Sequence, residues 1–164
     1  MRRHIISLLM ENEAGALSRV AGLFSARGYN IETLTVAPTN DPTLSRMTIV
    51  TSGTEAVIEQ INKQLNKLID VVTLVDLTEG EHIERELVMV KVMASDIDCD
   101  TMRQLVAEHQ ADVVDETGGA CVVELLGNSE NINAFIAALE PFSIVEVVRS
   151  GVSGIARGED ALRI

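Results

Sequence analysis

Aromatic side chains are scarce in this 164-residue chain, which contains no Trp, one Tyr and three Phe. Hydrophobic residues nevertheless make up 46% of it, so a folded core must be built from aliphatic side chains. Charged residues, at 23%, are too few and apolar residues too many for a disordered chain. The composition predicts a globular protein with one ordinary domain or two small ones.

Positive charge is also in short supply. Lys and Arg number 13 against 25 Asp and Glu, which gives a formal net charge of −12. Phosphate backbones and anionic lipid surfaces need basic patches, so nucleic acid and membranes are poor partners. No apolar run approaches the roughly 20 residues that span a bilayer. The basic and then apolar N-terminus is interrupted by Glu11 and Glu13, unlike a signal peptide. We therefore expect a cytoplasmic protein.

Cysteine and histidine are few and scattered. Cys99 and Cys121 lie far apart without Cys-x-x-Cys spacing, which favours reduced thiols over a disulfide. His4, His82 and His109 show no metal-ligand spacing, and His109 falls on the apolar stripe of a predicted helix, which is typical of a packing residue.

The known sequence motifs of catalysis are missing as well. The alternating Asp96, Asp98 and Asp100 resemble a calcium loop, but Thr101 and Ala107 stand where its Gly and Glu belong. No phosphate loop, dinucleotide fingerprint or nucleophile elbow occurs. We expect neither a catalytic residue nor a metal site in this chain.

Apolar periodicity predicts four helices and eight strands. The helical stripes are Leu17-Val20-Ala21-Phe24, Val57-Ile61-Leu65-Leu68, Met102-Leu105-Val106-His109 and Ile132-Phe135-Ile136-Leu139. The strands are expected at 4–9, 30–37, 44–51, 70–77, 86–94, 111–116, 120–126 and 143–149. The order is strand, helix, strand, strand, helix, strand, and then the same again. It predicts an α+β protein of two ferredoxin-like βαββαβ domains.

Helix ends are marked by expected capping residues. Gly28 is placed to end the first helix, and Ser52 with Glu55 has the spacing of a capping box for the second. Asp98 or Asp100 is expected to begin the third helix. Asn128 or Ser129 is expected to begin the fourth, which should stop before Pro141.

The domain boundary is expected in the polar stretch 78–85. We assign residues 1–79 to the first domain and 80–164 to the second, with 150–164 as a tail. Each half has about 70 residues and a marginal core on its own, and its sheet would have open edges. Edge-to-edge dimerisation would remedy both, and it would place a loop at the sheet edge in a subunit interface.

Two other functional classes share this element order. An RNA-recognition module stacks bases on aromatic residues of its first and third strands, but neither 4–9 nor 44–51 contains Phe, Tyr or Trp. An acylphosphatase-like enzyme needs an Arg after the first strand, and residues 10–16 contain none. Both classes lack the residues that their chemistry requires.

The loop at 10–17 holds the best candidate site. The first turn of the helix that follows contains Gly15 and Ala16, whose small side chains leave backbone N–H donors open to a carboxylate. Asn12 and Asn30 add amides that both donate and accept hydrogen bonds. Such a set suits a small zwitterion such as an amino acid. Each residue also has a plainer interpretation: Gly15 as a packing residue, Asn12 as an N-cap, and Asn30 as a turn residue.

This loop, with the Gly28–Ile31 turn, resembles the ACT domain, a βαββαβ module that binds amino acids. The resemblance rests on Asn12-Glu13-Ala14-Gly15-Ala16-Leu17, Arg19-Val20 and Gly28-Tyr29-Asn30-Ile31. Many ACT domains have Pro before the Gly, and Ala14 takes that place here.

A longer series of segments resembles the regulatory small subunits of acetolactate synthase. It includes Arg27-Gly-Tyr-Asn-Ile-Glu, Leu34-Thr-Val-Ala-Pro-Thr, Ser45-Arg-Met-Thr-Ile, the run 60–71, Glu84-Arg-Glu-Leu, Glu146-Val-Val-Arg-Ser-Gly and Ala156-Arg-Gly. The match covers nearly the whole chain and is densest in the first 80 residues.

The resemblance implies a non-catalytic partner of a catalytic large subunit that uses thiamine diphosphate, Mg²⁺ and FAD, with no cofactor in this chain. It implies a homodimer with valine bound between two ACT domains. The expected effector site comprises Asn12, Gly15, Ala16 and Leu17 of one chain with Asn30 and Ile31 of its partner. Arg149, Arg157 and Arg163 are expected contacts to the large subunit, with ordinary surface charge as the alternative. A free-standing ACT-domain amino-acid sensor is the alternative function.

Overall fold

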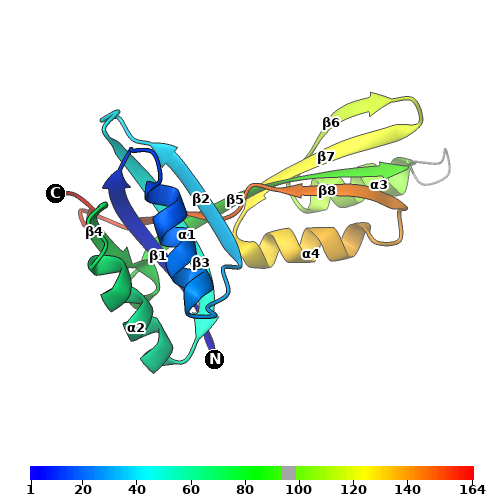
Figure 1. Ribbon diagram of the computed structural model, residues 1–164. Coiled ribbons are helices and arrows are strands. Elements are labelled where there is room, and N and C mark those ends of the chain that lie inside the picture. The colour runs from blue at the N-terminus through cyan, green and yellow to red at the C-terminus, as the bar shows by residue number, and fades with distance from the viewer. Residues whose placement is uncertain (94–98) are drawn as a thin grey trace. The chain divides into compact units, whose positions relative to one another are not determined.

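The chain folds into two compact units in a computed structural model that describes residues 1–93 and 99–164, with only the backbone of Cys99. The first unit comprises Met1–Ile83 together with Val152–Ile164, and the second comprises Glu84–Gly151. In each unit two helices cover one face of an antiparallel sheet (Figure 1). The predicted α+β class with a doubled βαββαβ order is confirmed.

The first unit follows the ferredoxin-like order. Its elements are β1 (Arg2–Glu11), α1 (Ala16–Ala26), β2 (Thr33–Pro38), β3 (Leu44–Gly53), α2 (Glu55–Asn66), β4 (Val71–Asp76) and the short 3-10 helix η1 (Leu77–Glu79). The sheet order is β2-β3-β1-β4, so β2 and β4 are the edges. β1 pairs with β3 from Arg2 opposite Gly53 to Glu11 opposite Leu44. The 10–17 loop therefore follows an internal strand and not an edge strand, which corrects its expected place.

Both faces of the first sheet are covered, which explains why β1 is buried from His4 to Met10. The helix face carries Ile6, Leu8 and Met10 of β1 against Val20 and Phe24 of α1. The opposite face carries a smaller cluster of Ile5, Val50, Leu77 and Val152. Val152 belongs to the C-terminal segment, so the chain returns to cover its own first sheet.

The second unit repeats the order of the first. Its elements are β5 (His82–Met93), α3 (Cys99–Glu108), β6 (Asp112–Thr117), β7 (Ala120–Gly127), α4 (Ser129–Leu139) and β8 (Ile144–Arg149), in the sheet order β6-β7-β5-β8. β5 shifts register between Lys91 and Val92, and β1 shifts at the matching place, between Leu9 and Met10. The duplication is therefore visible in the irregularities of the strands as well as in their order.

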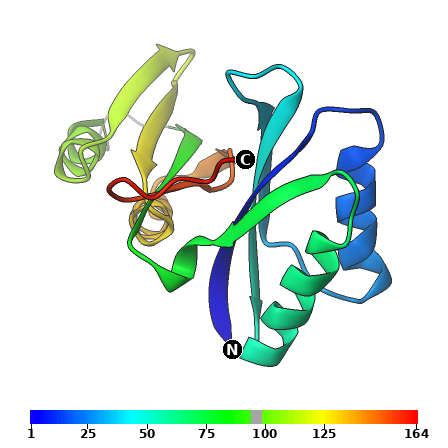
Figure 2. The same cartoon turned by 90° about the vertical axis from the view of Figure 1, so that its left-hand side faces the viewer.

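The C-terminal segment differs from its expected place. The sequence grouped residues 150–164 with the second domain as a tail. Val152–Ile164 instead belongs to the first unit, where it includes β9 (Ser153–Ala156) and where the Arg157 N–H donates to the Glu81 carbonyl at 2.9 Å. In Figure 2 this segment is the red end of the chain. The first of the two segments that form this unit ends at Ile83, inside the 78–85 stretch where a boundary was expected.

The end of α1 is confirmed. Gly28 has a φ of +70°, its N–H donates to Ser25, and the Tyr29 N–H donates to Phe24. This is a Schellman motif. The rings of Phe24 and Tyr29 also contact edge to face, 6.2 Å apart, which adds the hydrophobic contact typical of that motif.

The helix starts were predicted with mixed success. Asn128 is confirmed as the N-cap of α4, and its side chain accepts from the Asn131 N–H. The capping box at Ser52 is wrong, because Thr54 caps α2 and accepts from the Val57 N–H. Asp100 lies inside the first turn of α3 and is not its N-cap. Asp96 and Asp98 lie outside the described residues.

The remaining expectations concern packing and membranes. His109 is a packing residue as expected, with its ring 5.4 Å from that of Phe135. Cys121 is buried in the core of the second unit. Because the side chain of Cys99 is outside the described part, the state of the two thiols stays a prediction. Among the described residues no helix is long and apolar enough to cross a membrane.

Candidate effector site

The β1–α1 loop is held by the hairpin that joins β2 and β3. The Asn12 N–H donates to the Thr43 carbonyl at 2.8 Å, and its Nδ2 donates to the Pro42 carbonyl at 2.9 Å. These bonds fix the amide and leave its Oδ1 as an acceptor on an exposed side chain. The interpretation of Asn12 as an N-cap is wrong, because the N-cap of α1 is Gly15.

Gly15 gives α1 an open start. It has a φ of +86°, in the left-handed region that favours glycine, and it makes no side-chain capping bond. The Ala16 N–H already donates to the Glu13 carbonyl at 3.2 Å, so it is not the free donor that the sequence suggested. This leaves the N–H groups of Gly15, Leu17 and Ser18 without a backbone acceptor among the described residues, as donors for an anion at this helix start.

An arginine–aspartate pair borders this helix start. Arg19 Nε and Nη2 donate to the two carboxylate oxygens of Asp70, at 2.5 and 3.1 Å. The hydrogen bond from Arg19 holds the pKa of Asp70 below its usual value, and the bond to Asp70 raises the pKa of Arg19. A Cβ on Gly15 would lie 3.0 Å from Arg19 Nη1, so the guanidinium lies directly against the site.

Three carboxylates gather beside that arginine. Oxygens of Glu11, Glu13 and Asp70 lie within 4.8 Å of one another, two of the residues at least partly exposed and Asp70 buried. Both carboxylate oxygens of Asp70 accept hydrogen bonds from Arg19, so this group of carboxylates is poorly suited to bind a metal cation. Glu11 and Glu13 instead place negative charge where an ammonium group could bind.

The structure separates the two halves of the predicted site. β1 ends beside β3 at Leu44, whereas β2 begins beside β3 at Val50, toward the opposite end of the sheet. Asn12 and Asn30 therefore lie at opposite ends of α1, whose eleven residues span about 16 Å. Within one chain they do not meet, and only a second chain could bring Asn30 to Asn12.

The other predicted residues divide into buried and exposed. Ala16 is buried, whereas Leu17 is 43% exposed and does not belong to the core stripe that its spacing suggested. Ile31 packs partly against the core. Asn30 is exposed, and its carbonyl accepts from the Thr51 hydroxyl at 2.6 Å. Leu17 and Ile31 thus offer aliphatic surface, and the Asn30 amide faces solvent.

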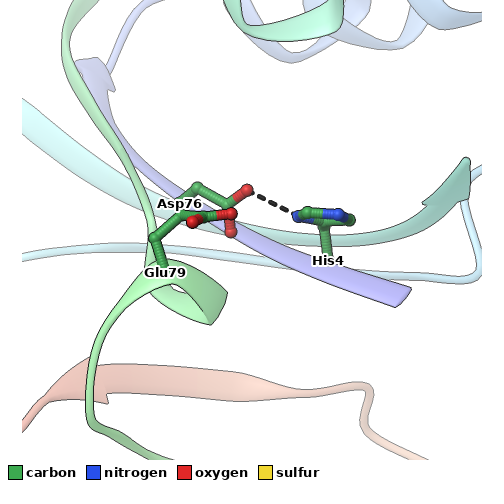
Figure 3. Close-up of side chains that lie close together, drawn as sticks. All are labelled: His4, Asp76 and Glu79. Atoms are coloured by element: carbon green, nitrogen blue, oxygen red, sulfur yellow. Dashed lines mark hydrogen bonds and ion pairs between the residues drawn. The ribbon is translucent and has the colours of Figure 1, made fainter. Parts of the chain in front are cut away.

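A second polar cluster was not foreseen from spacing. His4, Asp76 and Glu79 lie together at the start of β1 and the end of β4 (Figure 3). Asp76 accepts from His4 Nδ1 at 2.7 Å and from the Thr78 N–H at 3.0 Å. Arg2 Nη1 lies 3.8 Å from Glu79. These contacts join the start of β1 to the end of β4 and to η1.

The three arginines expected to contact the large subunit are in different settings. Arg149, at the end of β8, donates to both carboxylate oxygens of the buried Glu86 at 2.6 and 3.0 Å, and to Asn133 Oδ1. This hydrogen bonding raises the pKa of Arg149 and ties it to its own unit. Arg157 and Arg163 belong to the C-terminal segment of the first unit and are exposed.

Arg19 and Asp70 are the residues that sequence reasoning missed at this site. Arg19 stands four positions after Gly15, which places its side chain over the helix start, and that spacing was an available signal. Asp70 lies 51 positions away and offered none.

Comparison with known proteins points to one family along nearly the whole chain. Residues 6–73 match the model of the AHAS small subunit-like ACT domain, and residues 85–158 match the model of the small subunit of acetolactate synthase. The chain is 52% identical to the acetolactate synthase isozyme 3 small subunit of Escherichia coli K12, across 98% of this chain and 99% of that protein. It is 51% identical to the acetolactate synthase small subunit of Haemophilus influenzae, across 96% and 97%.

A solved structure supports the same assignment. The crystal structure of the acetolactate synthase small subunit from Thermotoga maritima aligns with a TM-score of 0.87 and 34% identity, across 98% of this chain and all of that one. With these matches and the duplicated fold, the chain belongs to the family of acetolactate synthase small subunits.

Proposed function

We propose that this chain is a regulatory subunit that binds the catalytic large subunit of acetolactate synthase, raises its activity and makes it sensitive to valine. The observation that carries the proposal is family membership along 98% of the chain, combined with an open helix start at Gly15. The chemistry would belong to the large subunit, which would hold thiamine diphosphate, Mg²⁺ and FAD. The expected cellular location is the cytoplasm.

Valine would bind at the start of α1. Its carboxylate would accept from the N–H groups of Gly15 and Leu17, where the helix dipole favours negative charge. Its ammonium would donate to Asn12 Oδ1, beside the carboxylates of Glu11 and Glu13. Because Asn12 Nδ2 is held by the Pro42 carbonyl, that oxygen is fixed before the ligand arrives.

A second copy of the chain would complete the site. Asn30 and Ile31 precede β2, an edge strand whose outer side has no partner strand in the described chain. Pairing of two such edges would extend the sheet and would bring the partner's α1–β2 turn toward this helix start. The isopropyl group of valine would then lie between Leu17 of one chain and Ile31 of the other.

Inhibition requires that valine favour one arrangement of the dimer over another. A coupling free energy of about 1–3 kcal/mol between effector site and catalytic centre is typical of such regulation. We propose that the valine-bound arrangement activates the large subunit less than the free one does.

Reconstitution tests the proposal. The purified chain is mixed with the catalytic large subunit, and acetolactate formation is measured against valine concentration. We expect activity to rise on mixing and to become valine-sensitive. Asn30→Ala should raise the half-inhibiting valine concentration about tenfold, the effect of losing one hydrogen bond to a charged group, with activation retained.

Asn66→Ala, an exposed position at the end of α2, is the matched control and should leave valine sensitivity unchanged. Unchanged sensitivity in Asn30→Ala would remove that residue from the site. If the chain bound valine by calorimetry but neither co-purified with the large subunit nor activated it, the free-standing sensor would replace this proposal.

A further inference from the structure

Arg46 is a half-buried cation without an acidic partner. It lies on β3, on the sheet face that the C-terminal segment covers. Its Nη2 donates to the Gly154 carbonyl of β9 at 2.9 Å, and in the described part of the chain its guanidinium forms no ion pair. Burial lowers the pKa of Arg46, yet an arginine stays charged at any physiological pH. Four of its five N–H donors are left for other partners.

The groove beside Arg46 is lined by hydroxyl groups. It has a volume of about 420 Å³ and lies between β2, β3 and β9. Its polar lining is formed by Arg46 with Thr35, Thr39, Thr48 and Ser153, and as far as the chain is described it includes no Asp or Glu. Although the net charge of the protein is −12, the lining of this groove carries a cation and no carboxylate, which favours a negatively charged ligand over a positively charged one.

Two of these four hydroxyl groups already donate a hydrogen bond within the chain, and the other two do not. Thr35 donates to the Val152 carbonyl, and Thr39 donates within its own turn. The hydroxyls of Thr48 and Ser153 form no hydrogen bond among the described residues, so they can donate to a ligand. Opposite Thr48 in register lies Ser7, whose buried Oγ also lacks a hydrogen-bond partner. The sheet face around Arg46 thus holds more donors than the chain itself satisfies.

We propose that Arg46, Thr48 and Ser153 form a binding site for a small oxyanion, a phosphate or a carboxylate, separate from the effector site at Gly15. The guanidinium would contribute a two-pronged contact, and the hydroxyls would donate to the remaining oxygens. The Gly154 bond holds the guanidinium against β9, so occupancy of the site would also fasten the C-terminal segment to the first sheet.

A neighbouring cavity of about 590 Å³ also reaches Arg46 but has the opposite character. Its lining includes Asp76, Glu79, Glu81, Glu159 and Asp160, so it repels anions. Arg46 and Ile155 line both the acidic cavity and the hydroxyl groove. The oxyanion is therefore assigned to the groove on the β2 side of the arginine.

Titration of the full-length chain tests the site. Inorganic phosphate and, separately, acetate are added at constant ionic strength, and amide and arginine side-chain signals are followed by NMR. We expect saturable shifts at Arg46, Thr48 and Ser153 with at least one of the two anions. The phosphate and acetate arms decide between a phosphoryl and a carboxylate ligand.

Variants separate binding from folding. Arg46→Gln should weaken binding at least tenfold, and Arg46→Lys should recover part of it. Ser153→Ala, at an exposed position, should weaken binding about threefold without unfolding the segment. Arg27→Gln, an exposed arginine after α1, is the control and should change nothing. Two results would overturn the proposal. One is that the shifts rise linearly and never saturate with either anion. The other is that Arg46→Gln and Ser153→Ala bind the anion as tightly as the parent chain does.

Discussion

Arg19 and Asp70 join the first turns of α1 to the start of β4 through a two-pronged ion pair, with N–O distances of 2.5 and 3.1 Å. The same guanidinium lies against Gly15, at the helix start proposed for the effector carboxylate. The pair therefore sets the position of a cation next to that site. It also links the site to the β4 edge of the sheet.

The acid dependence of stability should depend on this pair. The pKa of Asp70 is lowered in the folded chain, so its stabilising contribution is present above the unfolded-state pKa, about 3.9, and is lost as pH falls through the folded-state value. Asp70→Asn should be less stable than the parent at pH 7, and the difference should shrink at acid pH. Urea unfolding between pH 3 and 7 measures this.

Arg19→Gln provides the control for that experiment. It removes the partner that lowers the pKa of Asp70, so it should flatten the same part of the pH profile, and the double variant should add little further loss. A full additional loss in the double variant would mean that the two side chains stabilise the fold independently.

Gly15→Ala should destabilise the first unit by about 1–2 kcal/mol, because a residue with a Cβ is strained at a φ of +86°. It should also weaken valine binding, since the new methyl group would lie 3.0 Å from Arg19 Nη1. Thermal unfolding and calorimetry with valine measure the two effects. Gly22→Ala in the same helix meets no atom within 4 Å and should stabilise by about 0.5–1 kcal/mol, leaving valine affinity unchanged.

Thr54→Ala should cost about 1 kcal/mol, because it removes the side chain that caps α2 at the Val57 N–H. Ser52→Ala is the comparison, since Ser52 donates only to Glu32 in an exposed bond and should cost less than 0.5 kcal/mol. Chemical denaturation of both variants measures the two losses in the free energy of unfolding. Equal losses would restore Ser52 as a capping residue.

Val152→Ala should destabilise the chain by about 1.5–3 kcal/mol, because Val152 is fully buried on the second face of the first sheet. It should also speed proteolysis of the C-terminal segment. Val148→Ala, at a position 46% exposed on β8, should change neither quantity measurably. If the C-terminal segment of Val152→Ala resisted proteolysis as well as that of the parent chain, Val152 would not be what holds the segment on the sheet.

The fold was largely predictable because its signals are local. Apolar spacing located the four helices, and the Gly28 and Asn128 caps were readable within a few residues. Where several polar residues precede one helix, their spacing predicted the wrong N-cap residue. Ser52 and Thr54 both suit an N-cap, and only the backbone path after β3 places the Thr54 side chain at the Val57 N–H.

The candidate site was predictable only in part. Asn12, Gly15 and Leu17 follow one another closely, so their neighbourhood could be inferred from the chain. Asp70 comes to that helix start through the sheet, which places β4 beside β1, and no local pattern encodes this contact.

The sequence by itself determined the aliphatic core, the duplicated βαββαβ order and the small residues at the start of α1, since all three rest on residue type and short-range spacing. Tertiary structure decided which distant groups meet. It paired Arg19 with Asp70 and His4 with Asp76, and it returned Val152 to the first sheet. It also set Asn12 and Asn30 at opposite ends of α1, because antiparallel strands fix where each loop emerges.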